Sequence, residues 1–250
     1  MKSAVRRPVM KSDASLRGKT TLVTGASRGI GKAIATLFAH HGAQSIFVVR
    51  QRESGEKIVE GLKSSGLKAD VAVCDVTQLA QIKTLVFDLM QRYKQIDVLV
   101  NNAGLLLDDD RAMRPSQIDA HVFQETIETN LIGPMNLCSA FIPHIANGGR
   151  IINLSSGLGQ FEGEPEAFAP AYSISKAGLN MYTQKLAVDL QQKRIMVDSM
   201  DPGWVKTDMG GSGATTEPEQ AAETALFLAT REHSSSQTGL FWRRSQVIPW

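Results

Sequence analysis

The alternation of apolar stretches with amphipathic stretches is the feature that most constrains how this chain of 250 residues can fold. Apolar segments with strand character, most of them rich in β-branched residues, cover residues 19–24, 45–49, 71–74, 96–100, 150–154, 195–200 and 240–242. Segments with helical periodicity cover residues 30–41, 54–62, 79–93, 118–140, 171–190 and 218–229. Strands that alternate with helices form βαβ units, so the sequence predicts a parallel sheet.

The strands themselves indicate how the sheet is covered. Residues 96–100 are almost entirely apolar, which is expected when helices pack on both faces of a sheet. We therefore expect an α/β fold, a doubly wound parallel sheet of about seven strands in three α/β/α layers. The segment 118–140 forms one long helix, or two helices broken near Gly133 and Pro134. Thr216 and Glu219 have the spacing of a capping box for the last helix.

One domain, residues 18–250, accounts for this pattern. It follows a basic segment, residues 1–17, in which four cations precede the first acid, Asp13. We expect a flexible N-terminal extension there, and an organelle transit peptide is the alternative.

Composition excludes several classes of function. The net charge of +2 and the lack of a basic stripe argue against nucleic-acid binding. No stretch reaches the ~18 apolar residues of a membrane span. The five histidines lack zinc-ligand spacing, so we expect no metal site. Two cysteines, Cys74 and Cys138, favour free thiols in a reducing compartment, and the predicted location is the cytoplasm.

A glycine-rich turn joins the first strand to the first helix. Its glycines permit a tight turn and a close approach to a pyrophosphate, and the helix N-terminus offers amides and a positive dipole end. A glycine-rich turn without a ligand is the alternative. The residues predicted to bind phosphate are Gly25, Ser27, Arg28, Gly29, Ile30 and Gly31.

Two further patterns are typical of catalysis beside a cofactor. The fourth strand ends in Asn101-Asn102-Ala103-Gly104, and sheets of this kind bind ligands at the carboxyl ends of their strands. The small side chains of Asn102, Ala103 and Gly104 would let a cofactor lie close to the backbone. Tyr172 and Lys176 are four residues apart on a predicted helix, so they share one face. We expect the ammonium group to lower the pKa of the tyrosine.

Together, the spacing Gly-x-x-x-Gly-x-Gly, the Asn-Asn-Ala-Gly sequence and the Tyr-x-x-x-Lys pair resemble the short-chain dehydrogenase/reductase family, from about Gly18 onward. The resemblance implies a Rossmann-type fold and hydride transfer between a nicotinamide cofactor and a carbonyl or alcohol substrate. It implies that Tyr172 donates and accepts the proton, assisted by Lys176. Ser156, rather than Ser155, would donate a hydrogen bond to the substrate oxygen.

The resemblance implies a fourth catalytic residue. Asn130 would hold a water that links the lysine to solvent, and an exposed helical asparagine is the alternative. The gap from Ser156 to Tyr172 is longer than usual in the family, which indicates a small insertion within residues 160–169.

Cationic residues near the second strand point to the type of cofactor. Arg50 ends that strand where an NAD enzyme usually has an acid, and Arg28 lies in the glycine loop. We therefore expect NADP(H) in preference to NAD(H), unless both arginines are solvated surface residues. The resemblance also implies that Asp75 and Val76 contact the adenine, although Asp75 could instead cap a turn. Pro202, Gly203, Val205 and Thr207 would contact the nicotinamide end.

The remaining motifs concern substrate and partners. Leu105, Leu106 and Leu107 would line an apolar substrate site, and the three aspartates that follow form a solvated loop. Residues 209–216 form a lid or a plain surface loop. The tail, residues 239–250, resembles bacterial relatives that include developmental-signalling proteins. Its aromatic residues favour contact with a second subunit, in a homodimer or homotetramer.

These observations predict an NADP(H)-dependent oxidoreductase that interconverts a small-molecule ketone or aldehyde and the matching alcohol. The alternative is a cofactor-binding signalling or regulatory protein of the developmental C-signal type. The complete set of Asn130, Ser156, Tyr172 and Lys176 favours the enzyme, because a protein that only binds has no chemical need for it.

Overall fold

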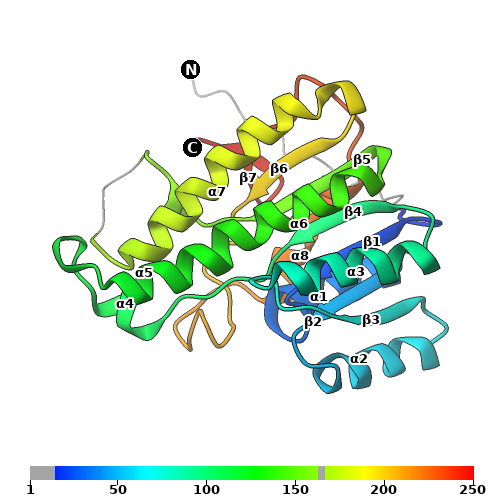
Figure 1. Ribbon diagram of the computed structural model, residues 1–250, viewed down its shortest axis with the longest axis horizontal. Helices are drawn as coiled ribbons and strands as arrows, with labels where there is room; N and C mark the ends of the chain where they lie inside the picture. Colours follow the sequence, from blue (N-terminus) through cyan, green and yellow to red (C-terminus); the bar gives the residue numbers. More distant parts are fainter. Residues whose placement is uncertain (1–14, 163–166) are drawn as a thin grey trace.

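A computed structural model describes residues 15–162 and 167–250, and a twisted sheet runs through the middle of it (Figure 1). Its strands are β1 (Thr20–Thr24), β2 (Gln44–Val49), β3 (Ala69–Val73), β4 (Ile96–Asn101), β5 (Ile145–Leu154), β6 (Met196–Met200), β7 (Phe241–Arg243) and β8 (Gln246–Ile248). Their order in the sheet is β3-β2-β1-β4-β5-β6-β7-β8. The predicted α/β architecture with a parallel sheet is confirmed.

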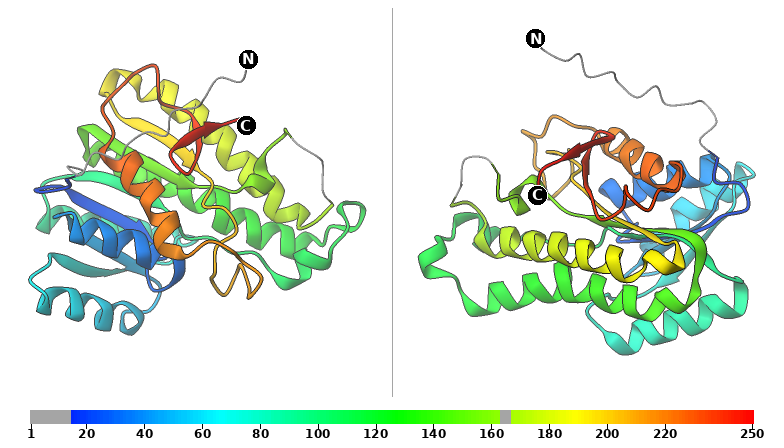
Figure 2. Two further views of the ribbon diagram at one scale, coloured as in Figure 1. Left: turned by 180° about the vertical axis from the view of Figure 1, so that it is seen from behind. Right: turned by 90° about the horizontal axis from the view of Figure 1, so that it is seen from above.

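The helices form a layer on each face of the sheet (Figure 2). They are α1 (Gly29–His40), α2 (Glu53–Ser64), α3 (Leu79–Arg92), α4 (Asp108–Ala112), α5 (Ala120–Ile127), α6 (Gly133–Phe141), α7 (Pro170–Asp189) and α8 (Pro218–Thr230). Apolar side chains of α1, α2 and α8 form one core with the sheet, and those of α3, α6 and α7 form a second core on the opposite face. The fold therefore has three layers, with helices on both faces of the sheet, as the apolar strands predicted.

The strand order reverses beside β1, which lies between β2 and β4. Chain connections on the two sides of this point run in opposite directions, so a crevice opens at the carboxyl ends of β1 and β4. The glycine loop follows β1, and the Asn-Asn-Ala-Gly sequence follows β4. The topology thus brings the two predicted cofactor motifs to one place.

An eighth strand, which the sequence analysis did not predict, extends the sheet at one edge. β8 runs antiparallel to β7, and Arg244 and Ser245 form the turn between them with positive φ angles of 49° and 61°. The turn is short, and neither residue is a glycine, so no sequence signal for a hairpin was present.

The helical region around Asn130 is continuous but irregular. A π-helical turn, η2 (Glu128–Ile132), joins α5 to α6, so the predicted helical segment is continuous and changes its geometry at Gly133, where the alternative prediction placed a break. Pro134 lies in the first turn of α6, where it is well tolerated. In an α-helix, the Asn130 carbonyl would accept a hydrogen bond from the N–H of the residue four positions later. That residue is Pro134, which has no N–H to donate.

Two predicted boundaries also differ. The capping box of α8 consists of Glu217 and Gln220, not Thr216 and Glu219, because Thr216 instead forms a β-bridge with Val205. Leu16, which we placed in the extension, is buried in the core and its N–H donates to the carbonyl of His41. The rest of the predicted extension, residues 1–14, lies outside the described residues.

None of the described helices is long and apolar enough to cross a membrane.

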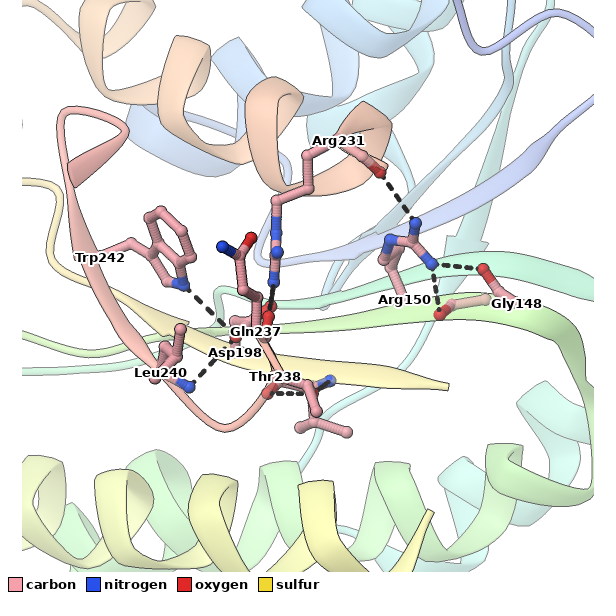
Figure 3. A network of polar contacts seen from close by, with 10 residues as sticks. Gly148, Arg150, Asp198, Arg231, Gln237, Thr238, Leu240 and Trp242 are labelled. Atoms are coloured by element: carbon pink, nitrogen blue, oxygen red, sulfur yellow. Dashed lines mark hydrogen bonds and ion pairs between the residues drawn. The ribbon is translucent and has the colours of Figure 1, made fainter. Parts of the chain in front are cut away.

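A buried polar network connects the sheet to α8 (Figure 3). Arg231, just after α8, forms an ion pair of 2.6 Å with Asp198 of β6, and its guanidinium lies over the ring of Trp242. The indole of Trp242 donates to the same carboxylate over 3.3 Å. Arg150 of β5 donates to the Arg231 carbonyl over 3.0 Å. These contacts fix the end of α8 against three neighbouring strands.

Candidate active site

A cleft of about 1550 Å³ opens at the carboxyl ends of the central strands. It runs from the glycine loop to the start of α7. The predicted residues that line it are Gly25, Ser27, Arg28, Gly29, Ile30, Gly31, Arg50, Asp75, Val76, Asn102, Ala103, Gly104, Tyr172, Lys176, Pro202 and Thr207. Of the other predicted site residues, Gly203 and Val205 adjoin Pro202, Ser156 follows the lining residue Ser155, and Asn130 is buried behind the lining.

The glycine loop has a shape that only glycine allows. Gly25 and Gly29 have positive φ angles of 65° and 53°. A Cβ atom at Gly31 would lie 2.3 Å from the side-chain nitrogen of Asn102 and 2.5 Å from the Gly25 carbonyl oxygen. The backbone of the loop is therefore exposed to the cleft beside the start of α1, as a bound pyrophosphate requires. These residues fit a dinucleotide cofactor.

Asn102 has a structural role that the sequence did not reveal. Its side-chain amide donates to the carbonyls of Thr24 and Gly25 over 2.8 and 3.2 Å. The Thr24 hydroxyl in turn accepts from the backbone N–H groups of Asn102 and Ala103, each at 3.0 Å. The two cofactor motifs therefore hold each other in place across the crevice.

Asn101, the residue before Asn102, also has a structural role that the sequence analysis did not predict. It is buried, and its amide donates to the side-chain oxygen of Asn153 over 2.8 Å. Asn153 donates to the Thr183 hydroxyl of α7 over 2.8 Å. A polar residue at the end of an otherwise apolar strand is the signal that could have indicated it.

The predicted adenosine end of the cleft carries two cations and one acid. Arg50 is exposed and, among the described residues, makes no ion pair, whereas Arg28 pairs with Asp208 at 2.7 Å. Asp75 lines the cleft, and its carboxylate also accepts from the backbone N–H and hydroxyl of Thr77 over 2.9 and 2.8 Å. Asp75 therefore stabilises a turn, the alternative considered above, in a position that also faces the cleft.

Tyr172 and Lys176 lie on the first two turns of α7 and are 8% and 4% exposed. The lysine nitrogen lies 5.4 Å from the centre of the tyrosine ring and donates to the Leu154 carbonyl over 2.8 Å. Burial lowers the pKa of Lys176 to about 8, because a buried ammonium is poorly solvated.

Burial raises the pKa of Tyr172 to about 12. A hydrogen bond from Ser156 opposes this rise, the charge of Asp201 adds to it, and the charge of Arg111 opposes it. The prediction that Lys176 lowers the pKa of Tyr172 was therefore wrong, because that pKa is raised in the folded protein. The lysine lies beside the ring and donates to a backbone carbonyl, so it gives the phenolic oxygen little stabilisation.

The two serines after β5 point to different environments. Ser155 is buried, and its hydroxyl donates to the Lys176 carbonyl over 3.4 Å. The Ser156 hydroxyl accepts from the Leu158 N–H over 3.2 Å and forms the hydrogen bond with Tyr172. This geometry supports the choice of Ser156. The predicted insertion, residues 160–169, includes residues 163–166, which lie outside the described residues.

Asn130 is buried within the π-helical turn, so the alternative of an exposed helical asparagine was wrong. Its side chain accepts from the N–H and donates to the carbonyl of Leu105, both over 2.8 Å. It also donates to the Ser175 hydroxyl over 3.1 Å. Asn130 thereby joins the segment after β4 to α7, and the predicted water relay to the lysine stays a prediction.

The three aspartates after Leu107 do not form a solvated loop, as we predicted. They begin α4, and although Asp108 and Asp109 are exposed, Asp110 is 0% exposed. Its carboxylate accepts from the backbone N–H groups of Ala171 and Tyr172 at the start of α7. No sequence signal indicates this burial, because an acidic run is usually solvated and the burial of one member depends on the tertiary structure.

The substrate side of the cleft is formed by segments far apart in the sequence. Leu105 and Met209 both line the cleft, and Arg111 of α4 donates to the Met209 carbonyl. The indole of Trp204 donates to the Gly210 carbonyl over 2.7 Å. Both contacts hold residues 209–216, the predicted lid, beside the cleft.

The C-terminal aromatic residues contact their own chain. Trp250 stacks on Phe241 with ring centres 5.5 Å apart, and Trp242 is buried. This packing removes the argument that these rings await a second subunit. The tail instead contacts the segment after Ser156, where Gln160 donates to the Pro249 carbonyl over 2.7 Å.

A glycine loop at the reversal point of a doubly wound sheet, with a tyrosine, a lysine and a serine along the same cleft, defines a dinucleotide-dependent oxidoreductase. Comparisons with known proteins agree. The family described as short chain dehydrogenase matches residues 19–218. The chain therefore belongs to the short-chain dehydrogenase family, whose members named below act on CH–OH or C=O groups, and it is an oxidoreductase of that kind.

Individual relatives cover nearly the whole chain. The 3-oxoacyl-(acyl-carrier-protein) reductase FabG of Chlamydia pneumoniae is 34% identical over 236 residues, 88% of this chain and 92% of that protein. Carbonyl reductase (NADPH) 1 of Mus musculus is 30% identical over 278 residues, 92% of this chain and 97% of that protein. A blue fluorescent protein from a metagenomic library, solved with NADPH, is 30% identical with a TM-score of 0.80, covering 91% of this chain and 96% of that one.

Proposed function

We propose that this enzyme uses NADP(H) to interconvert a small-molecule ketone or aldehyde and the matching alcohol, with Tyr172 as the acid and base. The observation that carries the proposal is that Tyr172, hydrogen-bonded to Ser156, faces the same cleft as the glycine loop. Proton transfer to a substrate oxygen requires a hydroxyl group within hydrogen-bond reach of the place where a cofactor ring can lie.

The side chains suit this chemistry at neutral pH. With a pKa of about 12, Tyr172 is protonated and can donate its proton to a carbonyl oxygen. Ser156 can stabilise the developing charge on that oxygen through its hydroxyl. Lys176, with a pKa of about 8, takes up and releases protons near neutral pH and lies beside the tyrosine ring. A bound nicotinamide supplies or accepts the hydride.

The proposal is tested by the loss of NADPH absorbance with a panel of ketones, aldehydes and 3-oxoacyl thioesters. The thioesters are included because the relative from Chlamydia pneumoniae is named a 3-oxoacyl reductase. Turnover of at least one carbonyl compound is the expected result. NADPH binding without turnover of any compound would contradict the proposal and favour a cofactor-binding regulatory protein.

We further propose that NADP(H) is preferred to NAD(H). Arg50 is exposed at the cleft, unpaired among the described residues, and can bind a 2′-phosphate, while β2 ends without an acid that would repel it. The Arg50→Ala variant should bind NADPH about tenfold more weakly, since a hydrogen bond to a charged group contributes ~1.5 kcal/mol or more. NADH affinity should not change, and Arg52→Ala is the control because Arg52 pairs with Glu56 instead.

Direct titration of the unmodified enzyme and both arginine variants with NADPH and NADH measures these affinities. Equal affinity for NADPH and NADH in the unmodified enzyme would contradict the preference. A loss of NADPH affinity of the same size in both arginine variants would show that only the general charge of the region matters.

We also propose a homodimer or homotetramer, now on a different observation. Ile174, Met181 and Val188 are 46, 53 and 75% exposed and lie seven residues apart, so they form one apolar stripe on the outer face of α7. A second copy of α7 would cover this stripe. The Val188→Glu variant should sediment as a smaller species than the wild type, and a monomeric wild type would contradict the proposal.

A further inference from the structure

We propose that Asp110 is a positioning residue for Tyr172, because it fixes the first turn of the helix that carries the proton donor. This inference rests on the proposed function for its kinetic consequence. Its structural part stands on contacts within α4 and α7 alone.

The start of α7 has no cap of its own. The residue at the N-cap position is Ala169, which has a positive φ angle of 48° and no polar side chain, and Pro170 follows it. The first N–H groups of a helix lack partners within the helix, and proline has no N–H. The N–H groups of Ala171 and Tyr172 therefore need an acceptor from elsewhere in the fold.

Asp110 supplies both acceptors. One carboxylate oxygen accepts from the Ala171 N–H over 3.0 Å, and the other accepts from the Tyr172 N–H over 2.8 Å. The carboxylate is fully buried, and its charge lies at the positive end of the helix dipole. Two hydrogen bonds to one rigid carboxylate fix both the orientation of the first turn of α7 and its distance from α4.

This clamp acts on the residue that performs the chemistry. Tyr172 is itself one of the two donors, and its phenol must reach Ser156 and the substrate oxygen at the other end of the side chain. Lys176 lies one turn further along the same helix, so both side chains move with its first turn. A misplacement of about 1 Å in an active site can cost about a hundredfold in rate.

α4 is held on its other side as well. Arg111, next to Asp110, donates to the Met209 carbonyl and pairs with Asp108 at 3.3 Å. α4 therefore connects the start of the catalytic helix to the segment beside the substrate region. Its two exposed aspartates, by contrast, form no hydrogen bond or ion pair with α7 among the described residues, which makes Asp109 a matched control.

Three variants test the inference kinetically. In Asp110→Asn, one oxygen is replaced by an NH₂ group that cannot accept, so kcat should fall about tenfold or more, while KM and NADPH affinity per folded site stay close to wild type. Asp110→Ala should lose more, and added formate should recover part of its activity by occupying the vacated space. Asp109→Asn should behave as the wild type.

A readout that does not depend on turnover separates the inference from the proposed function. The chain has three tyrosines, so ¹³C-labelling of the phenol ring carbon that bears oxygen gives three NMR signals, with Tyr172 assigned by Tyr172→Phe. In Asp110→Asn the Tyr172 signal should shift, while those of Tyr93 and Tyr182 stay in place. An unshifted signal, or a full kcat per NADPH site, would show that Asp110 only stabilises the fold and would overturn the inference.

Discussion

Burial sets the chemistry of Lys176, which lies 4% exposed beside the tyrosine ring. Its pKa falls from 10.5 in a free side chain to about 8 in the folded protein. Between these two pH values the unfolded chain binds a proton that the folded protein does not bind. The contribution of Lys176 to stability is therefore fully present above pH 10.5 and is lost as the pH falls to about 8.

The Lys176→Met variant removes this titration. We expect the difference in the free energy of unfolding, wild type minus variant, to rise by about 1.4 kcal/mol per pH unit between about pH 8 and about pH 10. Other titrating groups, including Tyr172 and the cysteines, affect both proteins and cancel in the difference. Urea unfolding across this range measures the difference, and a difference that does not depend on pH would contradict the lowered pKa of Lys176.

Single residues were predictable from the sequence only where a motif fixes their place. The glycines, Asn102, Tyr172 and Lys176 lie along one cleft, as their positions at strand and helix ends predicted. The burial of Asp110 and the raised pKa of Tyr172 were not predictable. The first depends on contacts between segments about sixty residues apart, and the second depends on burial in the folded protein, and no local pattern records either.

At the scale of elements, the β7–β8 hairpin and the last two residues support the serine segment. Gln160 donates to the Pro249 carbonyl, and the Phe161 N–H donates to the Trp250 carbonyl over 3.1 Å. Arg243 of β7 contacts both Gln160 and Asp201, the acid that influences Tyr172. The tail therefore supports the segment that follows Ser156 in the sequence.

Deletion of Pro249 and Trp250 should loosen the segment after Ser156, because it removes the acceptors for Gln160 and Phe161. We expect kcat/KM for the carbonyl substrate to fall about tenfold, a loss of ~1.4 kcal/mol in transition-state stabilisation, with NADPH affinity unchanged. Val247→Ala, at a half-exposed position of β8, is the control. Steady-state kinetics that match the wild type after the deletion would show that the tail does not position the serine.

Long elements were predictable, and of the short ones only β7 was predicted, from its apolar residues. The strands β1–β6 and six helical regions follow from their apolar patterns, because each buries one face or both faces against the sheet. α4 and β8 span five and three residues, too few to show a period. The π-helical turn at Asn130 arises where Pro134 disturbs the bonding pattern and the asparagine bonds to Leu105, and the sequence shows only the proline.

At the scale of the whole molecule, the parallel sheet follows from the alternation of strands and helices, but the network in Figure 3 does not. Burial raises the pKa of Asp198, and the charge of Arg231 opposes that rise. The side chains of Asp198 and Arg231 are 2 and 6% exposed, so the charge of the arginine, rather than water, stabilises the buried carboxylate. The network joins residues from four separate segments, and none of them forms a motif.

Arg231→Met should therefore destabilise the protein by about 3–5 kcal/mol, because it leaves a buried carboxylate without its cation. The double variant Arg231→Met with Asp198→Asn should be less destabilised than the single variant. Urea unfolding gives the free energies. A cost below about 1 kcal/mol for the single variant would show that water solvates the network and that the pair does not fix α8.

The proton transfer assigned to Tyr172 is tested most directly by Tyr172→Phe, which removes one oxygen and leaves the ring. NADPH consumption should be followed with a carbonyl compound that the wild type reduces, beside a fluorescence titration of NADPH binding. We predict that turnover falls about a thousandfold or more, within the ~10²–10⁴ that a positioned acid contributes, while NADPH affinity stays within about twofold. Near-normal turnover in the variant would contradict the assignment of Tyr172 as the proton donor.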